Sequence, residues 1–121
     1  KRKIMTTKDL ADIIRYAIPG PKGKIDKATR TFQALRIKIN EELDVLKKVI
    51  PEAVDMLLPK GKLAIITFHS LEDRIVKWSF RDLQEKNIVK IITKKPLLPS
   101  DKELDENPRS RSAKLRIIEK L

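Results

Sequence analysis

Polar side chains able to do chemistry follow directly after the most apolar segment of the chain. Residues 63–68 read Leu-Ala-Ile-Ile-Thr-Phe, and His69, Ser70, Glu72 and Asp73 come next. An imidazole, a hydroxyl and two carboxylates can donate or accept protons, and an aromatic ring can pack against a planar substrate. Gathered at one site, these groups could bind and orient a polar substrate. The candidate catalytic residues are Phe68, His69, Ser70, Glu72 and Asp73.

Each member of this cluster also has a purely structural interpretation. A single histidine is more often structural or exposed than catalytic. Ser70 could serve only as a helix cap, and Asp73 in a first helical turn could only offset the helix dipole. Their occurrence together at the end of one segment is what favours a functional site.

The surrounding pattern indicates how these residues would be positioned. The run 63–68 is too short for a helix and is typical of a parallel strand buried on both faces. Ser70 with Asp73 three residues later resembles a capping box, which predicts a helix from there to about Lys86 that stops at Asn87. Since ligands of open α/β sheets bind beyond the carboxyl ends of parallel strands, we expect the cluster at this edge of a sheet.

The remaining segments predict a mixed α/β fold. A short amphipathic helix is expected over residues 6–18, and Pro19 to Gly23 is the expected internal boundary. Apolar positions spaced by three or four predict a long helix from Thr31 to Ile50, with Pro51 opening a second helix that covers residues 52–58. Two more strands are expected at 89–92 and 115–118, and a helical turn after Ser100, closed by Asn107 and Pro108. This order predicts half of a doubly wound domain with helices on both faces of its sheet.

Positive charge is concentrated near the N-terminus. Residues 1–38 hold 11 Lys and Arg against 3 Asp and Glu, whereas residues 39–121 hold 17 against 14. Such a basic end favours a polyanionic partner, above all nucleic acid, although a lysine-rich solvated surface is the alternative. Residues 109–116 carry four basic side chains and no acid, and Arg suits phosphate contacts. The candidate RNA-binding residues are Arg30, Arg36, Arg74, Lys94, Lys95, Arg109, Arg111, Lys114 and Arg116.

Composition argues against several classes of site. The chain has no cysteine and one histidine, so disulfides and conventional zinc sites are excluded, and an intracellular, cytoplasmic location is favoured. Three glycines cannot build a glycine-rich nucleotide loop. No apolar run reaches the roughly 18 residues of a membrane-spanning helix. Because the first residue is Lys1, we expect that an N-terminal segment was removed or precedes it.

Three segments together resemble one family, the small-subunit rRNA cytosine-N4 methyltransferases, also called RsmH or MraW. They are Ala28-Thr-Arg-Thr-Phe-Gln-Ala-Leu-Arg-Ile37 followed by Asn40-Glu-Glu-Leu43; Phe68-His-Ser-Leu-Glu-Asp-Arg-Ile-Val-Lys77; and Thr93-Lys-Lys-Pro96 with Pro99-Ser100 and Asn107-Pro-Arg-Ser-Arg-Ser-Ala-Lys-Leu-Arg116. All three occur in the family's order and approximate spacing. One departure is Asp26-Lys27, where the family usually has His-Pro.

The resemblance implies a class I, Rossmann-like methyltransferase fold that binds S-adenosylmethionine. Residues 1–23 would be the end of an inserted helical domain with its linker, and residues 24–121 the C-terminal half of the methyltransferase domain. Residues 63–68 would be the fifth strand, and 89–92 and 115–118 the last two, an antiparallel pair. The family's cofactor-binding residues belong to its N-terminal half, so no cofactor-binding residue is assigned to this chain, and the missing half becomes an expected partner.

The reaction implied by the resemblance is methyl transfer to the exocyclic N4 of a cytidine in small-subunit ribosomal RNA. The target base would have to leave its stack and enter a pocket, which Phe68 or His69 could bound, while Ser70, Glu72 or Asp73 orients the amine. Two alternatives remain open: a non-catalytic RNA-binding or ribosome-associated module, and a pseudoenzyme that keeps the fold. The open sheet edges of an isolated half would also favour a homo-oligomer.

Overall fold

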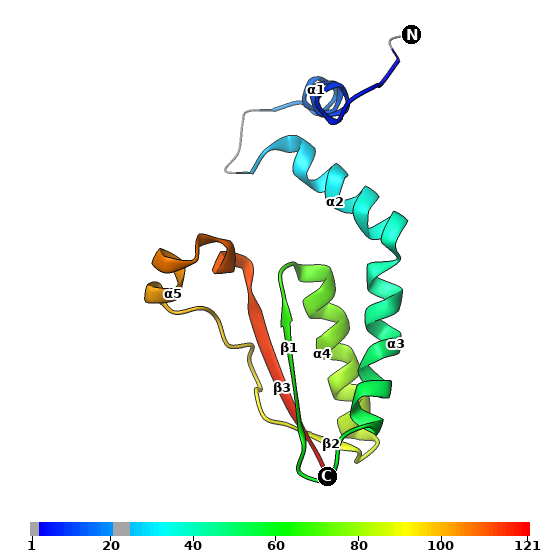
Figure 1. Ribbon diagram of the computed structural model, residues 1–121, viewed down its shortest axis with the longest axis vertical. Helices are drawn as coiled ribbons and strands as arrows, with labels where there is room; N and C mark the ends of the chain where they lie inside the picture. Colours follow the sequence, from blue (N-terminus) through cyan, green and yellow to red (C-terminus); the bar gives the residue numbers. More distant parts are fainter. Residues whose placement is uncertain (1–2, 21–24) are drawn as a thin grey trace. The chain divides into compact units, whose positions relative to one another are not determined.

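The computed structural model describes residues 3–20 and 25–121. The chain folds into two compact units, residues 1–42 and residues 43–121. The first unit is helical, and the second combines helices with a small sheet (Figure 1). No helix in the described ranges is long and apolar enough to cross a membrane.

The first unit consists of two helices joined through a small apolar core. Helix α1 spans Thr7–Ala17 and begins with a capping box, in which the Thr6 hydroxyl accepts from the Asp9 N–H at 3.1 Å. Helix α2 spans Lys27–Asn40, and its N-cap is Asp26. The buried residues between them are Ala11, Ile14 and Ala28, with Leu10 and Phe32 packed alongside. The helix predicted over residues 6–18 is thereby confirmed.

The long helix expected up to Ile50 is interrupted earlier than the sequence predicts. Helix α2 ends at Glu41, whose backbone is left-handed with φ 51°, and helix α3 spans Glu42–Asp55. The predicted helix start at Pro51 is wrong, because Pro51 lies inside α3. Proline's fixed φ is compatible with a helix, and the fully buried Ile50 and Val54 hold α3 to the core on both sides of it.

The second unit contains a three-stranded sheet in the order β1-β3-β2, in which both pairs are antiparallel. The strands are β1 (Lys62–Thr67), β2 (Val89–Ile91) and β3 (Lys114–Lys120), close to the predicted ranges. The predicted antiparallel pairing of the last two strands is confirmed. The expectation of a parallel strand buried on both faces is wrong for β1 within this chain, since β1 pairs antiparallel with β3 and Ile66 is exposed.

One face of the sheet carries the core of this unit. Helices α3 and α4 (Ser70–Glu85) both pack on it, through Ile50, Val54, Val76, Phe80 and Leu83 together with Val89 and Ile118 of the strands. In Figure 1 both helices lie on the same side of the strands. The prediction of helices on both faces is therefore not met by the residues of the second unit. An apolar run indicates that a strand is buried, but it does not indicate which element covers the strand.

The connection between β2 and β3 completes the unit. The predicted helical turn is α5 (Asp101–Glu106), with the Ser100 hydroxyl accepting from the Glu103 N–H as its N-cap. A 3₁₀ helix at Pro108–Ser112, which the sequence did not predict, leads from α5 into β3. Figure 1 shows this connection beside the end of β1 that leads into α4. The predicted boundary at Pro19 to Gly23 extends into residues 21–24, which lie outside the described ranges, and the domain division at residue 23 stays a prediction.

Candidate functional site

The turn from β1 into α4 is held by His69 and Glu72. His69 is the N-cap of α4, and its Nδ1 accepts from the Glu72 N–H at 3.3 Å. The Glu72 carboxylate accepts in return from the N–H groups of Phe68 (2.9 Å) and His69 (3.3 Å). The predicted capping box of Ser70 and Asp73 is wrong by one residue, because Ser70 is already the first residue of the helix.

This cap also assigns the imidazole proton. Since Nδ1 accepts a hydrogen bond, the neutral ring carries its proton on Nε2, which lies 3.2 Å from Glu72 Oε1. Both side chains thus close the strand-to-helix turn and face each other. Their first role in this geometry is to position Phe68 at the end of β1.

Asp73 faces the sheet and forms a buried ion pair with Arg116 of β3. Its carboxylate accepts from Arg116 Nε at 2.7 Å and from Nη2 at 3.2 Å, and Lys114 Nζ lies 3.6 Å away. The hydrogen bonds from Arg116 hold the pKa of Asp73 below its ordinary value. Asp73 therefore stays ionised at neutral pH, and both of its carboxylate oxygens accept hydrogen bonds from Arg116. This arrangement suits a structural link between α4 and β3 better than proton transfer.

An apolar groove lies on the face of the sheet away from α4. Ile66 and Leu115, which are paired in the β1–β3 register, point to this face because Arg116 and Ile118 point to the other. The groove has a volume of about 420 Å³. Phe68, 55% exposed, stands at its edge where β1 ends. Its lining residues are Ile66, Phe68, Leu97, Leu98, Pro99, Glu103, Asn107, Arg109, Ser110, Ala113 and Leu115.

Ser110 is the polar group of this groove that has most to offer a ligand. It is only 6% exposed, and its hydroxyl is buried without a hydrogen-bond partner among the residues of the described chain. The 3₁₀ helix fixes it, since its N–H donates to the Asn107 carbonyl and its carbonyl accepts from the Ala113 N–H. Buried hydroxyls in native proteins are normally paired, so an unpaired hydroxyl on a residue that lines a groove points to a ligand or to water.

Sequence reasoning missed Ser110 and Asn107 as members of the site. The signal was present in the run Asn107-Pro-Arg-Ser, whose serines were expected only to add neutral donors. The sequence does not reveal the long-range β-bridge between Leu97 and Leu115. Its two backbone hydrogen bonds of 2.9 Å close the groove beside Phe68.

The structure distributes the predicted basic residues over several surfaces. Arg109 lines the groove, and Arg111 is exposed on the same 3₁₀ helix. Arg116 is buried against Asp73, so the expectation that it faces RNA is not supported by its position. Arg74 lines a hollow between α3 and α4, and Lys94 lines a crevice near β2. Lys95 is exposed beside it.

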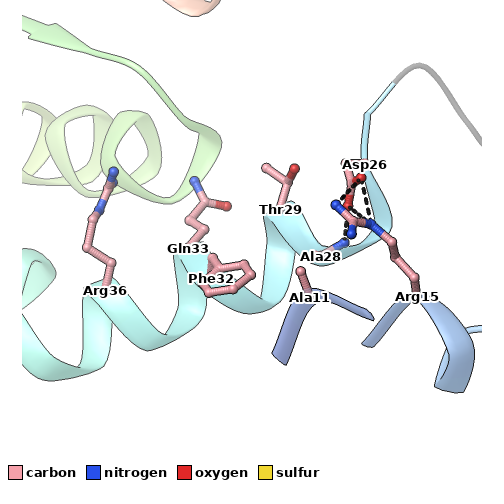
Figure 2. A pocket seen from close by; sticks show the side chains of 8 residues that line it. All are labelled: Ala11, Arg15, Asp26, Ala28, Thr29, Phe32, Gln33 and Arg36. Atoms are coloured by element: carbon pink, nitrogen blue, oxygen red, sulfur yellow. Dashed lines mark hydrogen bonds and ion pairs between the residues drawn. The ribbon is translucent and has the colours of Figure 1, made fainter. Parts of the chain in front are cut away.

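In the first unit, a hollow of about 550 Å³ lies between α1 and α2 (Figure 2). Gln33 and Arg36 line it, whereas the exposed Arg30 does not. Arg15 closes one end with an ion pair to Asp26 at 2.9 Å, and the hydrogen bond to Asp26 raises the pKa of Arg15. Figure 2 shows Thr29, Gln33 and Arg36 pointing to the same side of α2, and Arg36 pairs with Glu42 at 3.1 Å.

Comparison with known proteins gives one consistent result. Residues 1–121 match the MraW methylase family. The chain is similar to proteins named ribosomal RNA small subunit methyltransferase H: that of Sulfurihydrogenibium sp. (strain YO3AOP1) is 51% identical, over 97% of the chain and 41% of the relative. Those of Persephonella marina and Wolbachia pipientis are 46% and 52% identical, each over 100% of the chain and 42% of the relative. The chain thus spans about two fifths of the length of these relatives.

Proposed function

The chain belongs to the MraW methylase family, and on this premise we propose that it is the substrate-side part of an S-adenosylmethionine-dependent methyltransferase acting on cytidine N4 in small-subunit ribosomal RNA. Relatives named as rRNA small subunit methyltransferases support the RNA substrate and the methyl transfer. The cytidine, its N4 atom and the cofactor are proposed from the family resemblance.

The observation that carries the proposal is the groove beside Phe68. It lies where β1 ends, its volume of about 420 Å³ is in the range of small-ligand sites, and it combines apolar walls with an unpaired Ser110 hydroxyl. Enzymes that modify a base take it out of its stack, hold it between apolar groups and bind its edge by hydrogen bonds. Phe68 and Leu97 would pack against the flipped cytosine, and Ser110 would bind its edge.

These residues would contribute to catalysis by positioning the target cytosine. The lone pair of cytosine N4 is delocalised into the ring, so the amine is a weak nucleophile and gains most from being held in line with the methyl donor. His69 and Glu72 would act indirectly by fixing the turn that carries Phe68, with Ser70 beside it. Asp73 would act indirectly through Arg116.

The residues present do not fit the cofactor. Gly61 lies in the turn before β1, at the strand end opposite to Phe68, and Gly20 belongs to the first unit. Isolated glycines of this kind cannot build a glycine-rich loop. S-Adenosylmethionine would therefore be held by residues outside these 121, and no step of the reaction is assigned to it here.

RNA would be held near the groove by its basic rim. Arg109 and Arg111 on the 3₁₀ helix are exposed and suited to phosphate contacts. Arg30, Arg36, Arg74, Lys94, Lys95 and Lys114 remain proposed RNA-binding residues on other surfaces. The cytoplasmic location, or an organellar one in a eukaryote, belongs to the same proposal.

The test is incorporation of labelled methyl groups into small-subunit RNA by the full-length gene product that contains these 121 residues. We expect Phe68→Ala and Ser110→Ala to lower the rate by roughly tenfold or more, whereas the matched control Ser112→Ala, an exposed serine of the same 3₁₀ helix, keeps the wild-type rate. Incorporation that is absent from the wild type, while RNA still binds, would favour the non-catalytic RNA-binding module. Incorporation unaffected by Phe68→Ala would remove the groove from the proposal.

A further inference from the structure

Trp78 is the only tryptophan of the chain, and it stands on the solvent side of α4. Its side chain is 57% exposed, so part of the indole is open to a ligand. Two cations accompany it: the Arg81 guanidinium lies 5.2 Å from the ring centroid, and Lys77 Nζ lies 5.8 Å from it. The indole and the guanidinium are both planar groups on which a nucleic-acid base can stack.

The same two cations line a small basic crevice. Lys77 and Arg81 lie there with Lys94, Arg116 and the polar Thr93, around a volume of about 30 Å³. Arg116 is neutralised by Asp73. For Lys77, Arg81 and Lys94, the described part of the chain places no carboxylate within ion-pair distance. The crevice is too small for a base but has the charge and size for the oxygens of one phosphate group.

On its other side, Trp78 borders the hollow between α3 and α4. This hollow has a volume of about 540 Å³ and is lined by Leu71, Ile75 and Trp78 together with Lys47 and Arg74. Its one acid, Asp82, is bound to Lys86 at 2.7 Å. Trp78 therefore lies between the two cations of the basic crevice and a hollow lined by both apolar and basic side chains.

We propose that this face of α4, formed by Trp78, Lys77, Arg81 and Lys94, binds a single-stranded segment of RNA. One phosphate lies in the crevice, and a neighbouring base stacks on Trp78 and Arg81. A single strand is required because a duplex keeps its bases stacked inside and has none to offer the indole. The choice of RNA over other nucleic acids rests on the proposed function.

This surface is separate from the groove beside Phe68. The groove lies on the face of the sheet away from α4, whereas Trp78 belongs to the helix that covers the other face. One strand of RNA could contact both only by passing around the edge of the sheet. The α4 surface would thus hold RNA flanking the target nucleotide, without contacting the reacting atoms.

The experiment is a titration of the 121-residue chain with an unstructured oligouridylate, followed by the fluorescence of Trp78. We expect quenching of the emission and an affinity that falls as salt rises. The double variant Lys77→Gln/Arg81→Gln should bind about tenfold more weakly at ~0.1 M salt, and its salt dependence should be shallower by roughly 0.7 per lost phosphate contact. Trp78→Leu, measured by the anisotropy of labelled RNA, should bind at least about fivefold more weakly.

The matched control is Lys90→Gln/Lys102→Gln, which removes the same charge from exposed lysines of β2 and α5. It should bind like the wild type, and circular dichroism melting checks that every variant is folded. RNA binding without a change in Trp78 emission, equal losses in both double variants, or equal quenching by duplex RNA or oligoglutamate would each overturn the proposal. Phe68→Ala and Ser110→Ala should leave the quenching intact, so the two proposals fail separately.

Discussion

Asp73 and Arg116 are two charged side chains that the fold withdraws from water. Each is buried, and two hydrogen bonds of 2.7 and 3.2 Å join the carboxylate to the guanidinium across 43 residues of sequence. A buried ion pair is not strong evidence for net stabilisation, but removing one partner leaves an uncompensated charge. The pair therefore ties α4 to β3 in a way that neither residue can do alone.

From this geometry we expect Asp73→Ala to lower the free energy of unfolding by about 3 kcal/mol, because Arg116 then stays buried without its partner. Urea unfolding of the chain measures the effect. Asp105→Ala, which truncates an exposed aspartate of α5, is the control and should change stability by less than about 0.5 kcal/mol. A small effect of Asp73→Ala would mean that water enters and solvates Arg116.

The same pair predicts a pH dependence. The pKa of Asp73 is lower in the folded chain than in the unfolded one, so its stabilisation is complete above the unfolded value of about 3.9 and is lost as pH falls through the lower, folded value. We expect the stability difference between the wild type and Asp73→Asn to be constant between about pH 5 and pH 7 and to shrink below about pH 4. Urea titrations at each pH measure it, and a difference independent of pH would contradict the assignment.

At the scale of elements, α4 is defined at both ends by local hydrogen bonds. His69 and Glu72 begin it, and Asn87, with φ 57°, ends it in a Schellman motif, in which the N–H of Ile88 donates to the Leu83 carbonyl and the N–H of Asn87 to the Gln84 carbonyl. Ile88 and Leu83 belong to the core, so the motif is reinforced by packing. Helix α4 thereby holds Lys77, Trp78 and Arg81 in a constant register, and its N-cap fixes the turn that carries Phe68.

The N-cap of α4 can be tested by comparing two substitutions. His69→Ala removes the acceptor for the Glu72 N–H and should lower stability by about 1 kcal/mol, whereas His69→Asn supplies a side-chain oxygen and should lose much less. Thermal melting of both variants measures the difference. In the full-length protein, a methyl-transfer rate that falls equally in both variants would assign His69 a role beyond capping.

At the scale of the whole molecule, the described part of the chain presents a three-stranded sheet with an open edge. Strand β1 is at the end of the order β1-β3-β2, so one of its edges has no neighbouring strand among the described residues, and Ile66 on its outer face is exposed. An open edge of this kind pairs readily with another strand. The expected partners, the N-terminal half or a second copy of the chain, stay predictions.

We therefore expect the isolated 121-residue chain to show concentration-dependent self-association in analytical ultracentrifugation, because an uncovered apolar edge remains available. Ile66→Lys, which places a charge on the exposed face, should reduce association, and Ile92→Lys, another exposed isoleucine, is the control. A chain that stays monomeric over the accessible concentrations would contradict the expectation.

A final expectation concerns the cofactor. Because three glycines cannot build a glycine-rich nucleotide loop, and Gly61 lies at the end of β1 opposite to α4, the isolated chain should not bind S-adenosylmethionine, whereas the full-length gene product should. Isothermal titration calorimetry of both samples measures it. Saturable binding to the 121-residue chain would mean that the cofactor site has been assigned to the wrong part of the protein.

Interactions between residues close in sequence allowed most helices and strands of this protein to be predicted from its sequence. Capping residues such as Thr6 and Ser100, the stop at Asn87 and the apolar runs of the three strands depend on neighbours within a few residues, and they predicted the elements closely. The family resemblance was equally local in origin, because it rested on three continuous segments, and the match over residues 1–121 confirms it. The helix break at Glu41 escaped prediction, since apolar spacing continues through a left-handed residue.

Only the tertiary structure decided which residues share a site. Asp73 and Arg116, predicted to act on substrate and on RNA, instead bind each other, because the antiparallel pairing of β1 and β3 brings residue 116 beneath α4. Ser110 became a site residue because the bridge between Leu97 and Leu115 folds its segment against Phe68. The crevice lined by Lys77 and Arg81, the two cations next to Trp78, gained a further cation from Lys94, which follows β2. Such contacts join residues far apart in sequence, and their formation depends on packing that no single segment encodes.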